Sequence, residues 1–558
     1  MKLTLKRPDA QSADVRRALG LGAAAIALLA VTACSGSEST GNSEKVDVGG
    51  QLVAQMPAAK GDVDNIVWNL TDGEPDSLDP RMAATYSGGQ VVNNLCEPLV
   101  TNDAEYNLTP NLAEFEQVSP TELRYTLIAD AEFWDGTPVT AEDVAYSLNR
   151  AAEPSSFVNF IYANVKSIEA TGDREVTVRF SKPDEMFNNE MTTIAGLIVE
   201  KDFTEKAADK VGTPGGGLMC SGPFELTSWT SGDSIELTRN DTYWNPDRRP
   251  FAASVKFTFV TDTTAVTQAL ESGEIDGAYE LAASSLGSLA DSSVGNLVFG
   301  PSTQSVHFDV AGPDGPLADL KLREALGLVV DREGIAEKIY NGAASPLYTS
   351  VTPTTWPSDE SDLYQAAYDK FESARTYDVE KAKSLVEESD YSGQEIVLAT
   401  VAGDETQGRV AQLLQQDAKQ AGINIKIQTL QPLVMAQAGY DAAKRKGLDL
   451  MFSESFNGVQ DPLEPTGFMF LPGAFYNYTN FSDPTVTANL VQARQSFDGA
   501  ERARLFLAAQ EIYEAANATI PVVSTNTATF LSKDLTGAIT SFAYWAMPQM
   551  AYVGSTKD

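Results

Sequence analysis

The sequence is poor in histidine, in cysteine and in basic residues. Its 558 residues include one histidine, His307, and three cysteines. A lone histidine gives no cluster of ligands for a transition metal, and it leaves a nucleophilic cysteine or serine without a choice of general base. Lysine and arginine number 40 against 77 aspartates and glutamates, so the formal charge at pH 7 is −37. A chain of this charge repels nucleic acid and anionic lipid headgroups.

The usual patterns of hydrolytic enzymes are also missing. No Gly-x-Ser-x-Gly segment occurs, and Gly232-Asp233-Ser234 matches a serine-hydrolase block only superficially. The base for that serine would have to be His307, and Gln304 stands where such an enzyme needs an aspartate. The sequence therefore predicts a protein that is not an enzyme. A secreted serine hydrolase is a distant alternative, and a purely structural surface protein is another.

An apolar run near the N-terminus is typical of a targeting segment. Basic residues up to Arg17 precede residues 18–33, which are too few for a permanent membrane span. The run ends in Val31-Thr32-Ala33-Cys34, which resembles a bacterial lipobox. That resemblance implies a lipoprotein signal peptide over residues 1–33, cleavage before Cys34, and lipid attachment to Cys34. A plain signal peptide or an uncleaved anchor is the alternative.

The lipid would hold the protein at the extracytoplasmic face of the bacterial cell membrane, in contact with the periplasmic space. Arg16-Arg17 leaves export by the general secretory route and by the twin-arginine route both open. Residues 34–61 are rich in Gly, Ser, Asp and Ala without sustained periodicity, which predicts a flexible tether.

Cys96 and Cys220 form an isolated pair farther along the chain. In an oxidising compartment a disulfide is the default prediction for such a pair. It would close a long loop, for which chain entropy predicts about 4–5 kcal/mol of stabilisation and usually less in practice. Two buried free thiols are the alternative.

The most informative stretch runs from Phe133 to Arg150 and reads FWDGTPVTAEDVAYSLNR. Asp135-Gly136 predicts a turn, because glycine takes a positive φ without a Cβ clash. Thr140 is a good helix N-cap, and Asp143 is placed to complete a capping box. Residues 123–127 alternate as a strand. These residues predict a strand, a turn and a capped helix, and by themselves they indicate no catalytic or binding site.

As a combination, this stretch closely resembles the F-x-D-G-x-P-x-T-A-x-D-V signature of the family 5 extracellular solute-binding proteins of ABC transporters. This is the peptide-, dipeptide- and nickel-binding group. Further matches extend from about residue 62 nearly to the C-terminus, and they include Leu78-Asp79-Pro80, Thr109-Pro110-Asn111, Gly273-Glu274-Ile275-Asp276, Val330-Asp331-Arg332 and Ile520-Pro521-Val522-Val523. The family usually has an aromatic residue where Cys96 stands, and a second departure at Cys220 supports the disulfide.

The resemblance implies an α/β fold of the two-lobed periplasmic-binding-protein type (type II, similar to cluster C) with an extra subdomain in the first lobe. Hinge strands that the chain crosses twice would join the lobes. The expected parts are lobe I at 62–97 and 219–305, the extra subdomain at 98–218, lobe II at 306–515, and a return to lobe I at 516–558. Independently, residues 394–400, 407–420 and 422–427 predict a strand, a helix and a returning strand.

Two segments carry the family's ligand contacts. In peptide-binding members, the segment shortly after Leu-Asp-Pro pairs its backbone with the peptide as an added strand. Carried over to this sequence, that role falls on Ala84, Thr85 and Tyr86. An ordinary loop is the alternative.

The second segment is Ser455-Phe456-Asn457-Gly458-Val459-Gln460-Asp461-Pro462. Peptide-binding members commonly have an aspartate four positions before this proline, where it pairs with the ligand's α-amino group. Here the position is Gly458, which weakens the free-peptide interpretation because a buried ammonium needs a partner charge. Asp461 is a possible replacement, although helix capping is an equally simple role for it. Phe456 is predicted to line the cleft, and Asn457 to orient a polar ligand.

Two weaker candidates complete the site. Trp356, between Pro353 and Pro357, is a candidate lid aromatic, with packing under a loop as the alternative. Asn526, after the final crossover, is a candidate cleft residue. We expect no metal and no other cofactor, since His307 alone forms no cluster.

These features predict a substrate-binding lipoprotein of an ABC importer. It would capture a peptide-like solute in a cleft between the lobes and deliver it to the permease and ATPase for transmembrane transport. The alternative is the same scaffold binding an oligosaccharide, an opine-like compound or a metal chelate. We expect a monomer that contacts the membrane only through its lipid and does not bind nucleic acid.

Overall fold

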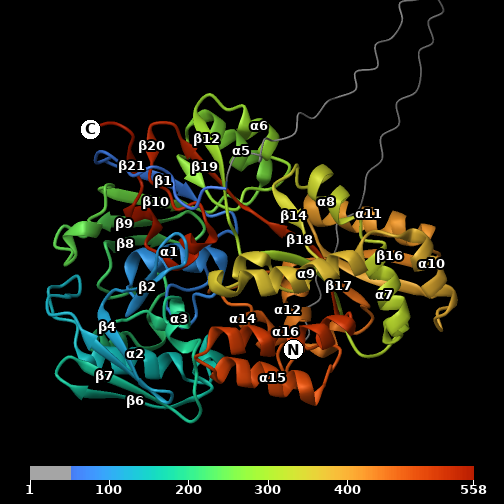
Figure 1. Ribbon diagram of the computed structural model, residues 1–558. Helices are drawn as coiled ribbons and strands as arrows, with labels where there is room; N and C mark the ends of the chain where they lie inside the picture. The colour runs from blue at the N-terminus through green and yellow to red at the C-terminus, as the bar shows by residue number, and fades with distance from the viewer. Residues whose placement is uncertain (1–51) are drawn as a thin grey trace, which may run out of the picture. The chain divides into compact units, whose positions relative to one another are not determined.

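The structure is a computed structural model that describes residues 52–558. The predicted signal peptide, Cys34 and residues 34–51 of the predicted tether lie outside the described residues. The described chain contains two large sheets, a smaller antiparallel sheet and many helices (Figure 1). This arrangement confirms the mixed α/β class.

The first large sheet combines strands from both ends of the described chain. Its central strand β1 runs parallel to its neighbours β10 and β11. Trp68 of β1 and Phe257 of β10 are fully buried. The strand order is β12 (Gly295–Gly300), β19 (Thr527–Ser532), β11 (Gly277–Ala278), β1 (Ile66–Asn69), β10 (Ser254–Thr258), β9 (Ser234–Arg239) and β8 (Phe224–Thr230).

The second large sheet contains the predicted strand–helix–strand unit. β15 runs parallel to both β16 and β17, and α11 (Glu405–Gln420) connects β15 to β16, which confirms that prediction. Phe308 and Phe452 pack edge to face in its core. The strand order is β14 (Ala344–Pro346), β18 (Thr519–Thr525), β13 (Ser305–Val310), β17 (Leu450–Ser455), β15 (Glu395–Val401) and β16 (Asn424–Leu430).

The most informative stretch of the sequence folds as predicted. α2 (Ala141–Ala151) begins after Thr140, and Thr140 and Asp143 form a complete capping box. Gly136 has a φ of 82°, as the preceding turn requires. α2 packs on a four-stranded antiparallel sheet in the order β4 (Ala113–Ser119), β5 (Glu122–Leu127), β7 (Glu175–Phe180) and β6 (Val165–Gly172).

Other helices cover the sheets or join them. Those around the first sheet are α1 (Tyr86–Leu95), α5 (Thr263–Ser272) and α6 (Leu286–Ala290), whereas α4 (Lys201–Ala207) packs against α2. Those that follow β13 include α7 (Leu320–Leu328), α8 (Arg332–Lys338), α9 (Ser361–Arg375), α10 (Val379–Glu387), α12 (Pro432–Tyr440), α14 (Leu463–Met469), α15 (Pro484–Gln495) and α16 (Gly499–Ala515). None of the helices within residues 52–558 combines the length and the apolar character needed to cross a membrane.

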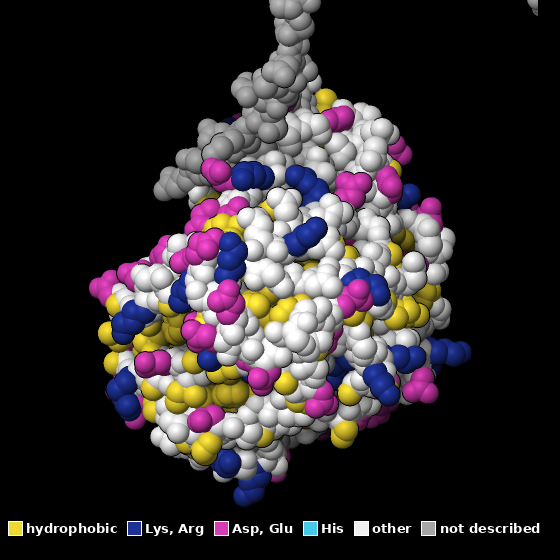
Figure 2. All heavy atoms as spheres, turned by 90° about the vertical axis from the view of Figure 1, so that its right-hand side faces the viewer, with side chains coloured by type: hydrophobic (Ala, Val, Ile, Leu, Met, Phe, Trp, Pro, Cys, Tyr) yellow, Lys and Arg dark blue, Asp and Glu magenta, His cyan; other side chains and the backbone are white. Residues whose placement is uncertain are grey.

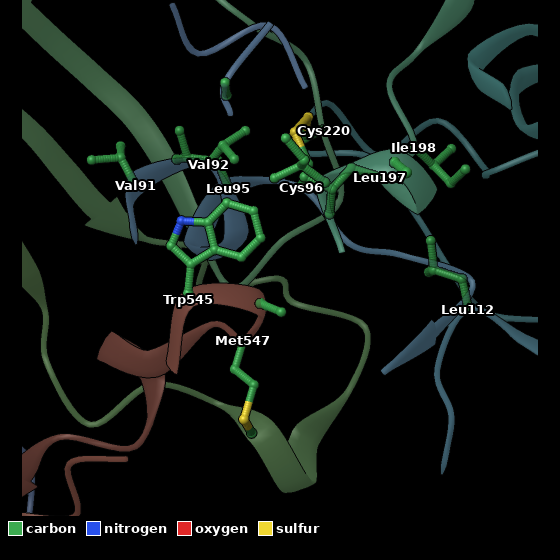
Figure 3. Close-up of a cluster of buried hydrophobic side chains, with 14 of the residues drawn as sticks. Val91, Val92, Leu95, Cys96, Leu112, Leu197, Ile198, Cys220, Trp545 and Met547 are labelled. Atoms are coloured by element: carbon green, nitrogen blue, oxygen red, sulfur yellow. A yellow bond between two sulfur atoms is a disulfide. The ribbon is translucent and has the colours of Figure 1, made fainter. Parts of the chain in front are cut away.

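Cys96 and Cys220 are joined by a disulfide in the core. Cys96 ends α1 and Cys220 lies shortly before β8, and both are fully buried. Figure 3 shows the bridge beside Leu95 and Leu197, with the Trp545 ring facing α1. The bridge therefore ties α1 to the segment that enters β8.

The chain passes between the two large sheets at two places near each other. Residues 301–304 lead from β12 of the first sheet to β13 of the second, and Asn526 alone separates β18 from β19. Ser524 donates a hydrogen bond to the Gln304 carbonyl at 3.2 Å, so the two crossings are in contact. Short paired crossings of this kind allow hinge motion between the sheets.

Candidate ligand-binding site

Two aromatic side chains from distant segments meet between the two large sheets. Tyr86 is the first residue of α1, and Phe456 directly follows β17. Their ring centroids lie 4.8 Å apart. Phe542 lies 5.9 Å from Tyr86 and 5.1 Å from Phe456, and Trp545 lies 5.0 Å from Phe456. The structure thus brings together two residues that the sequence places in separate ligand-contact segments.

The backbone before α1 is open to a ligand. Thr85 is the N-cap: its hydroxyl accepts a hydrogen bond from the Gly88 N–H at 3.0 Å, and its carbonyl accepts one from Trp545 Nε1 at 3.2 Å. Ala84 and Thr85 are exposed. Within residues 52–558, the Ala84 N–H and C=O have no backbone partner. Both groups are therefore available to an added strand.

Asn457 uses its polar groups within the protein. Its carbonyl accepts a hydrogen bond from the Thr303 hydroxyl at 2.7 Å, and its side-chain Nδ2 donates to the Asp461 carbonyl at 2.9 Å. The residue is buried. These bonds fix the loop after β17 against the crossing at residues 301–304, so Asn457 shapes the loop that carries Phe456.

Asp461 is fully engaged as well. Its Oδ1 accepts a hydrogen bond from the Leu463 N–H at 2.8 Å, at the first turn of α14, and its Oδ2 pairs with the Arg502 guanidinium. The residue is 4% exposed. Because both carboxylate oxygens already have partners, the structure gives Asp461 a capping and ion-pairing role at the base of the loop.

The carboxylate nearest Gly458 belongs to Glu464, which sequence reasoning missed. A Cβ added at Gly458 would lie 3.3 Å from Glu464 Oε1, and Glu464 Oε2 accepts a hydrogen bond from the Val459 N–H at 3.2 Å. Burial, with a smaller contribution from the charge of Glu190, raises the pKa of Glu464 to about 8. An acidic group thus lies beside the position where peptide-binding members commonly carry their aspartate.

Gln304 is a second residue that sequence reasoning missed. Its Nε2 donates to the Tyr86 hydroxyl at 3.3 Å, and its Oε1 accepts from the Ser302 hydroxyl at 2.9 Å. Burial and the charges of Glu280, Glu454 and other carboxylates raise the pKa of Tyr86 far above its ordinary value. Tyr86 is therefore a neutral hydrogen-bonding group whose orientation is set by a residue of the crossing.

Trp356 and Asn526 lie in different surroundings. The Trp356 ring stacks on Tyr364 at 5.9 Å and meets the edge of Tyr368 at 5.5 Å, so it packs against α9. Asn526 lies at the crossing between β18 and β19, where its N–H donates to the Ala343 carbonyl at 2.9 Å. Neither residue is in ring or hydrogen-bond contact with Tyr86 or Phe456.

Comparisons with known proteins identify this arrangement. A family model described as bacterial extracellular solute-binding proteins, family 5 Middle, matches residues 107–477. The chain belongs to this family. Its members are non-catalytic binding proteins of the extracytoplasmic space, so this protein is a solute-binding protein and not an enzyme.

Two curated relatives match this chain over nearly their whole length. The dipeptide-binding protein DppE of Bacillus subtilis is 25% identical over 551 residues, with 94% of this chain and 97% of the relative covered. The glutathione-binding protein GsiB of Escherichia coli O1:K1 / APEC is 27% identical over 498 residues, covering 86% and 92%. These matches extend the likeness beyond the segment that the family model covers.

A solved structure shares the fold of this solute-binding protein. The periplasmic binding protein DppA from Helicobacter pylori, in complex with the peptide STSA, superposes with a TM-score of 0.77 at 18% identity, covering 89% of this chain and 99% of that one. This match confirms the predicted periplasmic-binding-protein fold of the cluster C type.

Proposed function

We propose that this protein captures a peptide-like solute between Tyr86 and the loop after β17 and delivers it to the permease and ATPase of an ABC importer. The observation that supports this proposal most directly is the Tyr86–Phe456 contact, which joins the two segments that hold ligand in peptide-binding members. The open backbone at Ala84 supports it, since a peptide binds there by adding a strand. The names of DppE and GsiB, a dipeptide- and a glutathione-binding protein, agree with this solute class.

Capture works through the hinge. The predicted division into lobe I (62–97 and 219–305), an extra subdomain (98–218), lobe II (306–515) and a returning segment (516–558) is part of this proposal. The paired crossings at residues 301–304 and Asn526 support it. A solute that contacts both lobes binds the closed form more tightly than the open one, and so shifts the population toward closure. The transporter would recognise the closed form.

The proposal includes a lipid anchor at Cys34 and cleavage of residues 1–33. The Val31-Thr32-Ala33-Cys34 pattern supports it. Mass spectrometry of the N-terminus after expression in a bacterium tests it. We expect a lipid-modified Cys34 at the N-terminus, which a Cys34→Ser variant should lack; an unmodified N-terminus at another residue contradicts the anchor.

A thermal-shift titration with alanine dipeptide to pentapeptide tests the solute class. A ligand that binds only the folded state stabilises it by about 2.7 kcal/mol at 100 times its Kd. We expect a concentration-dependent rise in the melting temperature that Phe456→Ala abolishes. Phe475→Ala is the matched control, because Phe475 is 51% exposed. No shift with any peptide, or an equal loss in both variants, contradicts the proposal.

A further inference from the structure

Four carboxylates follow strand ends of the two large sheets, and the charges of three of them, Glu280, Glu454 and Asp72, act on Tyr86. Asp72 and Glu280 follow the carboxyl ends of β1 and β11, which are parallel neighbours in the first sheet. Asp404 follows β15, and Glu454 lies near the carboxyl end of β17, which is parallel to β15 in the second sheet. Ligands of open α/β sheets bind beyond the carboxyl ends of parallel strands. Each sheet therefore contributes two carboxylates to the place where a ligand is expected.

The charges of these carboxylates act on one another. Burial, and after it the charges that include Asp404, Glu280 and Asp72, raise the pKa of Glu454 to about 7. Burial likewise raises the pKa of Glu280 to about 7 and that of Asp72 to about 6. Asp72 and Glu454 are nevertheless accessible to water. Both carboxylates are therefore within reach of a dissolved solute.

The partners of these carboxylates are neutral. Glu280 accepts a hydrogen bond from the Tyr544 hydroxyl at 2.9 Å, and Asp404 accepts one from the Gln407 N–H at 2.9 Å. Within residues 52–558, none of the four forms an ion pair with a lysine or arginine. Elsewhere such pairs are common, and Figure 2 shows acidic and basic side chains interspersed over one outer face. The cationic partner is therefore missing where the carboxylates gather.

The Tyr340 hydroxyl independently indicates a missing partner. Tyr340 is 7% exposed, and in the described part of the chain its hydroxyl has no hydrogen-bond partner. The charges of Glu454 and Asp404 add to the effect of burial in raising the pKa of this hydroxyl, so it lies within their electrostatic reach. A buried hydroxyl left without a partner costs about 1–3 kcal/mol. A ligand with hydrogen-bonding groups at this place would remove that cost.

We infer that the solute is cationic, and that Glu280 and Glu454, one from each large sheet, hold its ammonium or guanidinium groups beside the Tyr340 hydroxyl. This inference rests on the proposed function and adds the charge of the substrate. Among residues 52–558, no group of three or more His, Cys, Asp or Glu side chains could hold a metal ion. Carboxylates contributed by both sheets suit an extended organic cation, such as a peptide with lysine or arginine side chains, because each carboxylate can hold a different charged group.

The charge of the solute also bears on closure. Two negative carboxylates on each sheet repel one another when the sheets approach, and a bound cation removes that repulsion. A cationic solute therefore favours the closed form more strongly than a neutral solute of the same size. Closure therefore depends on the positive charge of the solute as well as on its contact with the Tyr86 ring.

Calorimetric titration of the purified protein with four probes tests the inference. The probes are trilysine, trialanine, triglutamate and the non-peptide polyamine spermidine. We expect trilysine to bind about 10- to 100-fold more tightly than trialanine, the range of one charge-assisted hydrogen bond. Triglutamate should show no binding.

Conservative variants locate the effect. Glu454→Gln and Glu280→Gln should each weaken trilysine binding about tenfold or more without lowering the melting temperature of the ligand-free protein. Tyr340→Phe should weaken it several-fold, although it removes no bond made within the free protein. Glu271→Gln is the matched control, since this exposed glutamate lies on α5. It should leave trilysine affinity unchanged.

Each outcome decides between the two claims. Equal affinity for trilysine and trialanine overturns the cationic preference and leaves the peptide function standing. Binding of spermidine alone supports the cationic site and overturns the peptide function. If neither trilysine nor spermidine binds, the inference is overturned, whatever the affinity for trialanine. Unchanged trilysine affinity in both glutamine variants also overturns it.

Discussion

Replacing Arg494 with methionine removes the centre of a buried ion network. Arg494 on α15 donates to Asp184 at 2.8 Å and to the two Glu190 oxygens at 3.1 and 2.6 Å. The side chains of Asp184 and Glu190 are 1% and 2% exposed. Their charges raise the pKa of Arg494, as expected for a cation held between two carboxylates. The network fastens residues 184–190, beyond the four-stranded sheet, to α15.

The expected loss follows from the burial of the carboxylates. Removing one partner of a buried ion pair costs about 3–5 kcal/mol, because the other charge is left without compensation. Arg494 itself is 26% exposed, so we expect the lower end, about 3 kcal/mol. For a chain of this length roughly 1 kcal/mol corresponds to 1 °C, so the melting temperature should fall by about 3 °C at pH 7.

The pH dependence gives this variant a distinct signature. Burial already raises the pKa of Glu190, and Arg494 lowers it, so without Arg494 the folded state holds the Glu190 proton to still higher pH than the unfolded chain does. The loss of stability is therefore full near neutral pH and shrinks as the pH falls toward the ordinary pKa values of about 4. Arg504→Met is the control, since Arg504 is 67% exposed and 3.9 Å from Glu501.

Thermal unfolding of both variants, followed by circular dichroism between pH 4 and pH 8, provides the measurement. The control should change stability by less than about 1 kcal/mol. Equal melting temperatures for the two variants at pH 7, or a deficit that does not change with pH, would refute the reasoning that this network is desolvated.

Four further outcomes are expected. Alanine at Cys96 and Cys220 should cost up to about 5 kcal/mol, because the bridge spans 124 residues, and reduced wild-type protein should melt at the same lowered temperature. Thr140→Ala should cost about 1 kcal/mol in denaturant unfolding and Thr140→Ser almost nothing, whereas equal losses would contradict the capping role. Trilysine affinity should fall from pH 8 to pH 5.5, as Glu280 and Glu454, with pKa values of about 7, take up protons and lose charge. A constant affinity would contradict these assignments. Because both pKa values exceed the ordinary value of about 4.3, the stability of the ligand-free protein should also fall as pH rises through this range.

The local parts of the fold could be predicted because short-range physics determines them. The capping box at Thr140 and the β15–α11–β16 unit follow from residue spacing and periodicity. The meeting of Tyr86 and Phe456 could be predicted only through the family pattern, since 370 positions separate them and no local property links them. Their contact depends on how the two sheets are joined.

The remaining features of the site depend on tertiary placement. Asp461 directly precedes a helix-starting proline, where an acid commonly caps a helix, and only the position of α16 shows that Arg502, 41 residues later, pairs with it. Glu464 lies in the first turn of a helix, where an acid commonly interacts with the helix dipole, so its place beside Gly458 could not be recognised. Asp72, Glu280 and Glu454 come from separate strand ends that only the sheet topology brings within electrostatic reach of Tyr86, and Asp404 acts on Glu454 from a fourth.

Hydrogen–deuterium exchange, with and without saturating trilysine, tests the central claim most directly, because it locates the solute without a variant. The account predicts slower exchange at residues 84–88 and 456–459, on the two sides of the Tyr86–Phe456 contact, and at the crossings near residues 301–304 and 526. Protection confined to other surfaces, with these segments unchanged while trilysine is bound, would contradict capture between the two sheets.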